Sequence, residues 1–141
     1  PNSNAVSALN LLRLHRLARG DEYRDRAMGI LRASSALMRA HPSAFAQMLV
    51  ALDFHLSPPF EAVIARGPAP NEAVRAAAAL RRRFAPSLVI ASGEGVPMAE
   101  DRPPGAEGFL YLCRDTACLA PTADIEAVIA ALDDVNAYDL E

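Results

Sequence analysis

The sequence predicts an α+β fold in which three antiparallel helices precede a small three-stranded α/β subdomain that contains a βαβ unit. Apolar residues recur at helical spacing up to residue 57. After Pro58 and Pro59 the pattern changes to short apolar runs rich in β-branched residues, which are typical of buried strands. Turn residues separate these segments at short intervals. We therefore expect a helical hairpin segment over residues 1–57 and an α/β subdomain over residues 60–141.

The first helix is predicted to begin at Ser3 or Asn4, because either side chain can accept hydrogen bonds from the amides of the first turn. Gly20-Asp21 is predicted to end this helix and to cap the next one. The residues that we expect to face inward share helical spacing and are Val6, Leu9, Leu12 or Leu11, Leu14 and Leu17.

The second helix is expected to end at His41-Pro42, since proline disfavours helical backbone in the residue before it. Ser43 is then predicted to cap a third helix that stops at Pro58. Short connections make consecutive helices antiparallel neighbours. The predicted inward residues are Tyr23, Ala27, Ile30, Leu31, Leu37 and Met38 in the second helix, and Phe45, Met48, Leu49, Leu52 and Leu56 in the third. These apolar faces are wide, so we expect further helices to pack against them.

The remaining chain predicts a strand at 61–65, a helix from its N-cap at Asn71 to about Phe84, and a strand at 87–91. Short links make this a βαβ unit, so these two strands should be parallel. A long acidic loop at 93–108 precedes a third strand at 109–113. A last amphipathic helix is expected to turn Ile125, Val128, Ile129 and Leu132 inward.

The composition of the chain argues against several classes of function. The chain has 141 residues, of which 52% are hydrophobic and 22% charged, and this composition is typical of a globular protein. A net charge of -3 argues against nucleic acid or an anionic membrane as a partner. No apolar stretch is long enough to span a bilayer. Two cysteines without an export signal predict a reducing cytoplasm.

Cys113 and Cys118 form the sharpest candidate pair in the sequence. They could close a small disulfide loop, exchange disulfides with another thiol, or supply two metal ligands. Zinc needs about four ligands and no histidine lies nearby in the sequence, so we predict no metal and no cofactor. The preferred interpretation is that both cysteines are small buried hydrophobic residues, with redox exchange as the alternative.

Other polar features have structural interpretations. The three histidines are scattered: His15 is expected on the polar side of the first helix, and His41 and His55 lie at or near helix ends. The run 81–83 places three arginines at a helix C-terminus, where positive charge is favourable. Gly93-Glu94-Gly95 lacks the third glycine of a dinucleotide-binding loop. No pair of catalytic carboxylates is evident, so no catalytic residue is assigned.

Three segments together resemble a known family. Pro1-Asn2-Ser3-Asn4-Ala5 resembles its Pro-Ser-Gly-Asn-Ser opening, and His41-Pro42-Ser43-Ala44-Phe45 with the following Met48 to Phe54 is similar to its late helix. The segment from Tyr111 to Pro121 resembles its terminal strand followed by Cys-x4-Cys-x2-Pro. The family is that of the bacterial YyaL-type thioredoxin-domain proteins, which are related to the spermatogenesis-associated thioredoxin-like proteins of animals.

The resemblance implies a parent protein with three parts: a thioredoxin-like module, an α/α toroid similar to six-hairpin glycosidases and N-acylglucosamine 2-epimerases, and an α/β cap. Residues 1–57 would end the toroid and residues 60–141 would form the cap, without catalysis of their own. Ser3 and Asn4 would be ligand-facing candidates at the toroid mouth, although Ser3 and Ala5 depart from the family pattern. Expected partners are the upstream toroid and the thioredoxin-like module, or a second copy through the helical face. The alternatives are a part of a carbohydrate-processing enzyme and a thiol-redox partner of the upstream module.

Overall fold

The computed structural model describes residues 2–57, 59–65, 70–93, 95–100, 102–103, 105, 108–114 and 117–136. The chain divides into two compact units, Pro1–Pro59 and Phe60–Glu141, and each is described by itself. The first unit is helical and the second combines helices with a sheet, so the predicted α+β class is confirmed.

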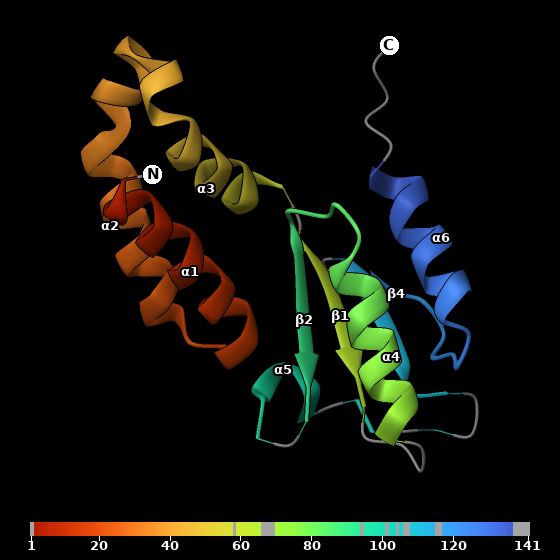
Figure 1. The fold of residues 1–141 in the computed structure, drawn as a ribbon. Helices are drawn as coiled ribbons and strands as arrows, with labels where there is room; N and C mark the ends of the chain where they lie inside the picture. The colour runs from red at the N-terminus through yellow and green to blue at the C-terminus, as the bar shows by residue number, and fades with distance from the viewer. Residues whose placement is uncertain are drawn as a thin grey trace. The chain divides into compact units, whose positions relative to one another are not determined.

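The helical unit consists of α1 (Ser3–Ala18), α2 (Asp21–Ala40) and α3 (Ala46–Leu56), with a short 3-10 turn, η1 (Pro42–Phe45), before α3. Helix α1 contacts both α2 and α3, whereas α2 and α3 make fewer contacts with each other. Consecutive helices run in opposite directions, as predicted (Figure 1). Helix α1 is therefore the helix of this unit against which both α2 and α3 pack.

The structure corrects three predicted helix ends. Asn2, and not Ser3 or Asn4, is the N-cap of α1, and its side-chain oxygen accepts a hydrogen bond from the Asn4 amide at 2.8 Å. Arg19, and not Gly20, adopts the left-handed conformation after α1, with φ of 55°. Gly20 is instead the extended N-cap of α2, because α2 begins at the very next residue. Residue 43 lies within η1, so α3 begins three residues after the predicted cap.

Small side chains line much of the core of the helical unit. The buried apolar residues are Ala5, Ala8, Leu9, Leu12, Ala27, Leu31, Met38, Met48, Ala51 and Phe54. Several residues predicted to face inward are exposed instead, namely Val6, Leu14, Leu37, Leu49 and Leu56. Alanines on the contact lines take the inward positions and let the helices approach closely, so these larger residues lie beside the contacts.

The second unit is built on a sheet with strand order β2-β1-β3-β4. Its strands are β1 (Phe60–Ile64), β2 (Leu88–Ser92), β3 (Leu110–Arg114) and β4 (Ala117–Cys118). Strands β1 and β2 are parallel, as the βαβ pattern predicts, and β3 runs antiparallel to β1. The sheet has four strands where three were predicted, because β4 contains two exposed residues and lacks any apolar pattern.

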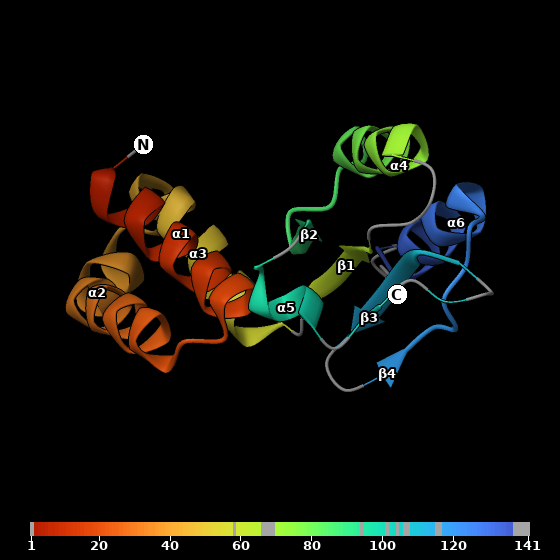
Figure 2. The same ribbon diagram turned by 90° about the horizontal axis from the view of Figure 1, so that it is seen from below.

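Helices cover the two faces of this sheet differently (Figure 2). Helices α4 (Pro70–Arg81) and α6 (Ile125–Asn136) pack on one face, where the main apolar core forms. A single turn, α5 (Pro97–Glu100), contacts β1 and β2 and lies on the opposite side of the sheet (Figure 2). This turn lies within the segment predicted to be loop, since four residues are too few to show a helical period. Helix α4 also ends at Arg81, three residues before the predicted end.

Gly108 occupies a position that only glycine fits. Its φ is +155°, and a Cβ added here would lie 2.0 Å from the carbonyl carbon of Thr122. The close approach lets residue 122 bond to the backbone at the start of β3, where Leu110 donates to Thr122 and Thr122 donates back, each at 3.0 Å. Gly108 therefore helps to fix where β3 begins.

Candidate functional site

A disulfide joins Cys113 of β3 to Cys118 of β4, with the two sulfur atoms 2.07 Å apart. The cysteines are directly opposite each other in the antiparallel pair, as are Arg114 and Ala117. Cys113 is 1% exposed, whereas Cys118 lies on the exposed edge strand. The preferred sequence interpretation, two small buried hydrophobic residues, is therefore wrong for the exposed Cys118, and the small disulfide loop that the spacing also allowed is present.

A buried carboxylate lies on the same face of the sheet as the disulfide. Glu61 is directly opposite Cys113 in the β1–β3 pair and is 3% exposed. Arg102, which follows α5, places a guanidinium nitrogen 3.7 Å from a Glu61 carboxylate oxygen. The opposite charge offsets part of the cost of taking a carboxylate out of water. Neither residue was among the sequence candidates, although a glutamate inside a buried strand is the signal that could have found it.

The same guanidinium connects the carboxylate to the disulfide. One Arg102 nitrogen lies 4.0 Å from the Cys118 sulfur, and the other donates a hydrogen bond of 2.5 Å to the Met98 carbonyl. Met98 is fully buried in α5, so this hydrogen bond ties the arginine to a fixed part of the fold. The arrangement places a positive charge beside the sulfur of Cys118.

An apolar hollow of about 250 Å³ adjoins the disulfide. Its walls come from the ends of β1 and β3, from the β4 segment and from α6, and they comprise Phe60, Leu112, Cys113, Arg114, Ala117, Cys118, Leu119 and Ala131. The Arg114 guanidinium lies over the Phe60 ring, 5.1 Å from its centre. The apolar walls of the hollow belong to the core face of the sheet that α6 covers, whereas Glu61 and the disulfide lie on the opposite face, because side chains alternate along each strand.

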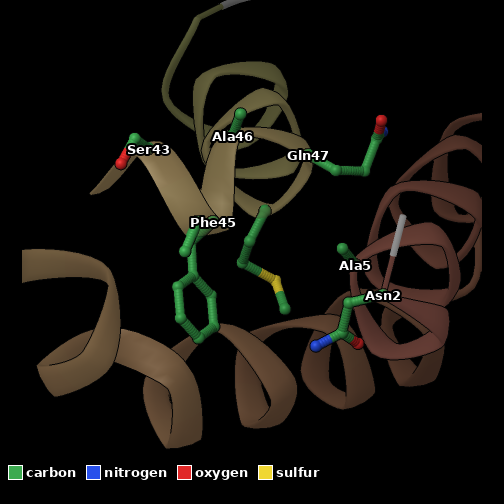
Figure 3. A pocket seen from close by; sticks show the side chains of 8 residues that line it. Asn2, Ala5, Ser43, Phe45, Ala46 and Gln47 are labelled. Atoms are coloured by element: carbon green, nitrogen blue, oxygen red, sulfur yellow. The ribbon is translucent and has the colours of Figure 1, made fainter. Parts of the chain in front are cut away.

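A second hollow, of about 340 Å³, lies in the helical unit. Figure 3 shows its walls coming from the start of α1 and from η1 with the first turn of α3. The hydrogen-bonding side chains among its walls are those of Asn2, Ser43 and Gln47. Ser3 and Asn4, the predicted ligand-facing residues, are exposed in the first turn of α1 and are not among the described walls of this hollow.

The remaining sequence candidates have structural surroundings. His15 contacts the Gly20 carbonyl at 3.0 Å, and His41 is the C-cap of α2. Arg83 pairs with Asp133 of α6 at 2.8 Å on the surface. Within the described part of the chain, no three His, Cys, Asp or Glu side chains gather where they could hold a metal ion. No helix among the described residues is long and apolar enough to cross a membrane.

Comparison with known proteins gives one distant relative. The chain is 27% identical over 139 residues to Spermatogenesis-associated protein 20 of Rattus norvegicus. The alignment covers 88% of this chain but 17% of the relative, so the chain spans about a sixth of that protein's length. No family model matches the chain, and no solved structure gives a significant match. The relative is of the spermatogenesis-associated kind that the sequence motifs resemble, and the chain is similar to a part of a longer protein.

Proposed function

We propose that this chain is a non-catalytic structural segment of a larger thioredoxin-domain protein, in which its helices complete an α/α toroid and its sheet unit forms a cap. The observation that carries the proposal is the alignment with 17% of a much longer relative. The parent protein's activity would then belong to parts outside these residues, and we place the protein in the bacterial cytoplasm.

Exposed apolar side chains on all three helices support this role. Val6 and Leu14 on α1, Leu37 on α2, and Leu49, Val50 and Leu56 on α3 are each at least 36% exposed. Helices that are apolar beyond one face are usually buried between neighbours. We propose that the preceding helices of the toroid cover these side chains in the parent protein.

The first test is the length of the native polypeptide, measured by mass spectrometry on protein isolated from its own cells. The proposal expects a chain several times longer than 141 residues with a thioredoxin-like module. A native chain of about this length would contradict the proposal, and attention would then move to the disulfide site.

A second test uses the isolated 141-residue chain, in which no upstream helices cover the apolar faces. We expect concentration-dependent self-association in sedimentation velocity, since exposed apolar patches drive association. Replacing Leu37 and Leu56 with glutamine should weaken the association, whereas Val74→Gln on α4 serves as an equally exposed control. A monomer at high concentration would count against an uncovered helical face.

A carbohydrate-binding role within the toroid is the second candidate. The observation that favours it is the hollow at the start of α1, where two amides and a hydroxyl offer hydrogen bonds. Its described walls include no carboxylate or histidine, so this hollow would hold a ligand without acid–base chemistry. Sugar-dependent thermal stabilisation of the full-length protein, lost in the Asn2→Ala and Gln47→Ala variants, would support it. A full-length protein unaffected by any sugar would contradict it.

A thiol-redox role is the third candidate, and the unequal exposure of Cys113 and Cys118 favours it. Disulfides in reducing compartments are usually transient and catalytic or redox-sensing. A disulfide that the protein holds in the cytoplasm would therefore be open to exchange. The simplest test is whether dithiothreitol reduces it in the folded protein, and resistance under native conditions would contradict the role.

A further inference from the structure

We propose that the Cys113–Cys118 disulfide exchanges with an external dithiol through Cys118, that Cys113 is the internal partner sulfur, and that Arg102 is a positioning residue for the Cys118 sulfur. This inference rests on the thiol-redox candidate above and adds the direction of the reaction and the class of reactant. Three observations carry it: the unequal exposure of the two cysteines, the position of Arg102, and the exposed Leu119 next to Cys118.

Access decides which sulfur is attacked. A thiolate must reach one sulfur of the disulfide along the bond axis, so exposure selects the site of attack. Cys118 lies on the outermost strand of the sheet and is exposed. Cys113 is 1% exposed within β3, with β1 on its other side. An external thiolate therefore reaches the Cys118 sulfur first.

The exchange balances in two steps. The thiolate of the external dithiol attacks the Cys118 sulfur, a new S–S bond forms, and the bond to Cys113 breaks. The electron pair goes to the Cys113 sulfur, which takes a proton from water and becomes a thiol. The second thiolate of the reactant then attacks its own mixed disulfide and releases Cys118 as a thiolate. The external dithiol is oxidised to a disulfide and the protein disulfide is reduced, with two electrons transferred.

Arg102 assists the second step of the exchange. Its nitrogen 4.0 Å from the Cys118 sulfur stabilises negative charge on that sulfur when it leaves the mixed disulfide. In the reverse direction, the Cys118 thiolate attacks an external disulfide and the Cys113 sulfur resolves the mixed disulfide.

The exposed apolar residue next to Cys118 indicates the kind of reactant. Leu119 is 51% exposed. A protein dithiol can pack an apolar residue that flanks its cysteine against Leu119, whereas a small hydrophilic thiol gains little from this contact. We therefore assign a protein dithiol as the reactant, and a small monothiol is the alternative that the experiment separates.

The test traps the mixed disulfide on the oxidised wild-type chain. The protein probe is a thioredoxin whose resolving cysteine is replaced by serine, and the small probe is glutathione. Remaining thiols are blocked before digestion with trypsin. Trypsin cuts after Arg114 and so separates peptide 84–114, which carries Cys113, from peptide 115–141, which carries Cys118. The adduct therefore maps to one cysteine.

We expect the amount of thioredoxin adduct on peptide 115–141 to exceed that on peptide 84–114 by at least about tenfold, as the difference in access predicts. We also expect the thioredoxin adduct to form faster than the glutathione adduct at equal thiolate concentration. An adduct mainly on Cys113 would overturn the direction of attack. Equal or faster reaction with glutathione would overturn the assignment to a protein dithiol. If neither probe nor dithiothreitol opens the disulfide unless the chain is denatured, the redox candidate itself fails.

Arg102 is tested separately by the alkylation rate of Cys118 in the reduced protein at neutral pH. Arg102→Gln should slow alkylation about tenfold, because the thiolate loses its positive neighbour. Arg102→Lys should restore most of the rate, and Arg82→Gln, in the exposed turn after α4, should leave it unchanged. A slow rate in both Arg102 variants, with the folded state verified by thermal unfolding, would reduce the arginine to a structural role.

Discussion

The two units of this chain bury their large apolar side chains to different degrees. The sheet unit surrounds residues such as Ile64, Leu80, Leu110 and Leu132, each 2% exposed or less, with strands and helices. The helical unit buries four alanines in its core and leaves large residues such as Leu37 and Leu56 more than half exposed. The difference teaches that the sheet unit buries the large apolar residues of its strands, although Val74, Phe84 and Leu119 outside the strands are exposed, while all three helices of the helical unit leave large apolar residues uncovered.

Truncation of a core side chain is expected to change the free energy of unfolding most, and to different degrees in the two units. Leu80→Ala should lower the free energy of unfolding by roughly 3–5 kcal/mol, because a cavity remains among tightly packed neighbours. Leu12→Ala in α1 should cost less, roughly 2–3 kcal/mol, because the thinner helical core can relax around the change. Val74→Ala, at a position 69% exposed on α4, is the control. Urea denaturation measures all three, and an equal or larger cost for Leu12→Ala would break the comparison.

Loss of the disulfide should weaken the sheet unit alone. The bond spans a sequence separation of 5, and loop closure over so short a segment contributes about 2 kcal/mol. Replacing both cysteines with serine should therefore lower the stability of the sheet unit by about that amount and leave the helical unit unchanged. Hydrogen exchange resolved by peptide can follow the two units separately. Loss of protection in α1 to α3 would show that the two units do not unfold independently.

The backbone at the start of β3 provides a third test. Gly108→Ala should destabilise the sheet unit by more than about 1 kcal/mol, because its Cβ would overlap the Thr122 backbone at a φ that alanine avoids. Gly105→Ala is the matched control, since a Cβ there meets nothing within 4 Å. Thermal unfolding measures the melting temperatures of the two variants. A lower melting temperature for Gly108→Ala alone would show that one close backbone contact limits which residues the sheet unit accepts there. Similar melting temperatures would argue against that contact.

A smaller effect is expected at the first helix of the other unit. Asn2→Ala should cost about 1 kcal/mol, because its side chain caps the Asn4 amide. Ser3→Ala and Asn4→Ala remove no cap and should stay within about 0.5 kcal/mol. Chemical denaturation of the three variants distinguishes the structural cap from the two positions that sequence reasoning favours. A larger loss of stability for Ser3→Ala than for Asn2→Ala would support the N-cap that the sequence predicts at Ser3.

The smallest change in stability is expected at the exposed leucines. Leu37→Gln and Leu56→Gln should each change the free energy of unfolding by less than about 0.5 kcal/mol in the isolated chain, since both side chains already meet solvent. The same substitutions should weaken self-association, as measured by sedimentation. A loss above 1 kcal/mol in a monomeric sample would mean that these side chains stabilise the helical unit itself.

Local patterns predicted most of the regular structure. The three longer strands lie within one residue of their predicted positions, and the parallel β1–β2 pair follows from the βαβ pattern. Strand β4 and helix α5 were missed, because two and four residues are too few to show a period. Gly20 was predicted to end α1, but Arg19 takes the left-handed conformation because α2 follows without a spacer.

The candidate site was predictable only in part. The spacing of Cys113 and Cys118 identified the pair, but not whether the two cysteines would bond. The sequence by itself determined the α+β class and the order of helices before strands, because hydrophobic periodicity is a local property of the chain. Tertiary structure alone decided that Glu61 and Arg102 meet beside Cys118, and that Cys118 is exposed whereas Cys113 is buried. These contacts join segments far apart in the sequence, and sheet order and register set their distances.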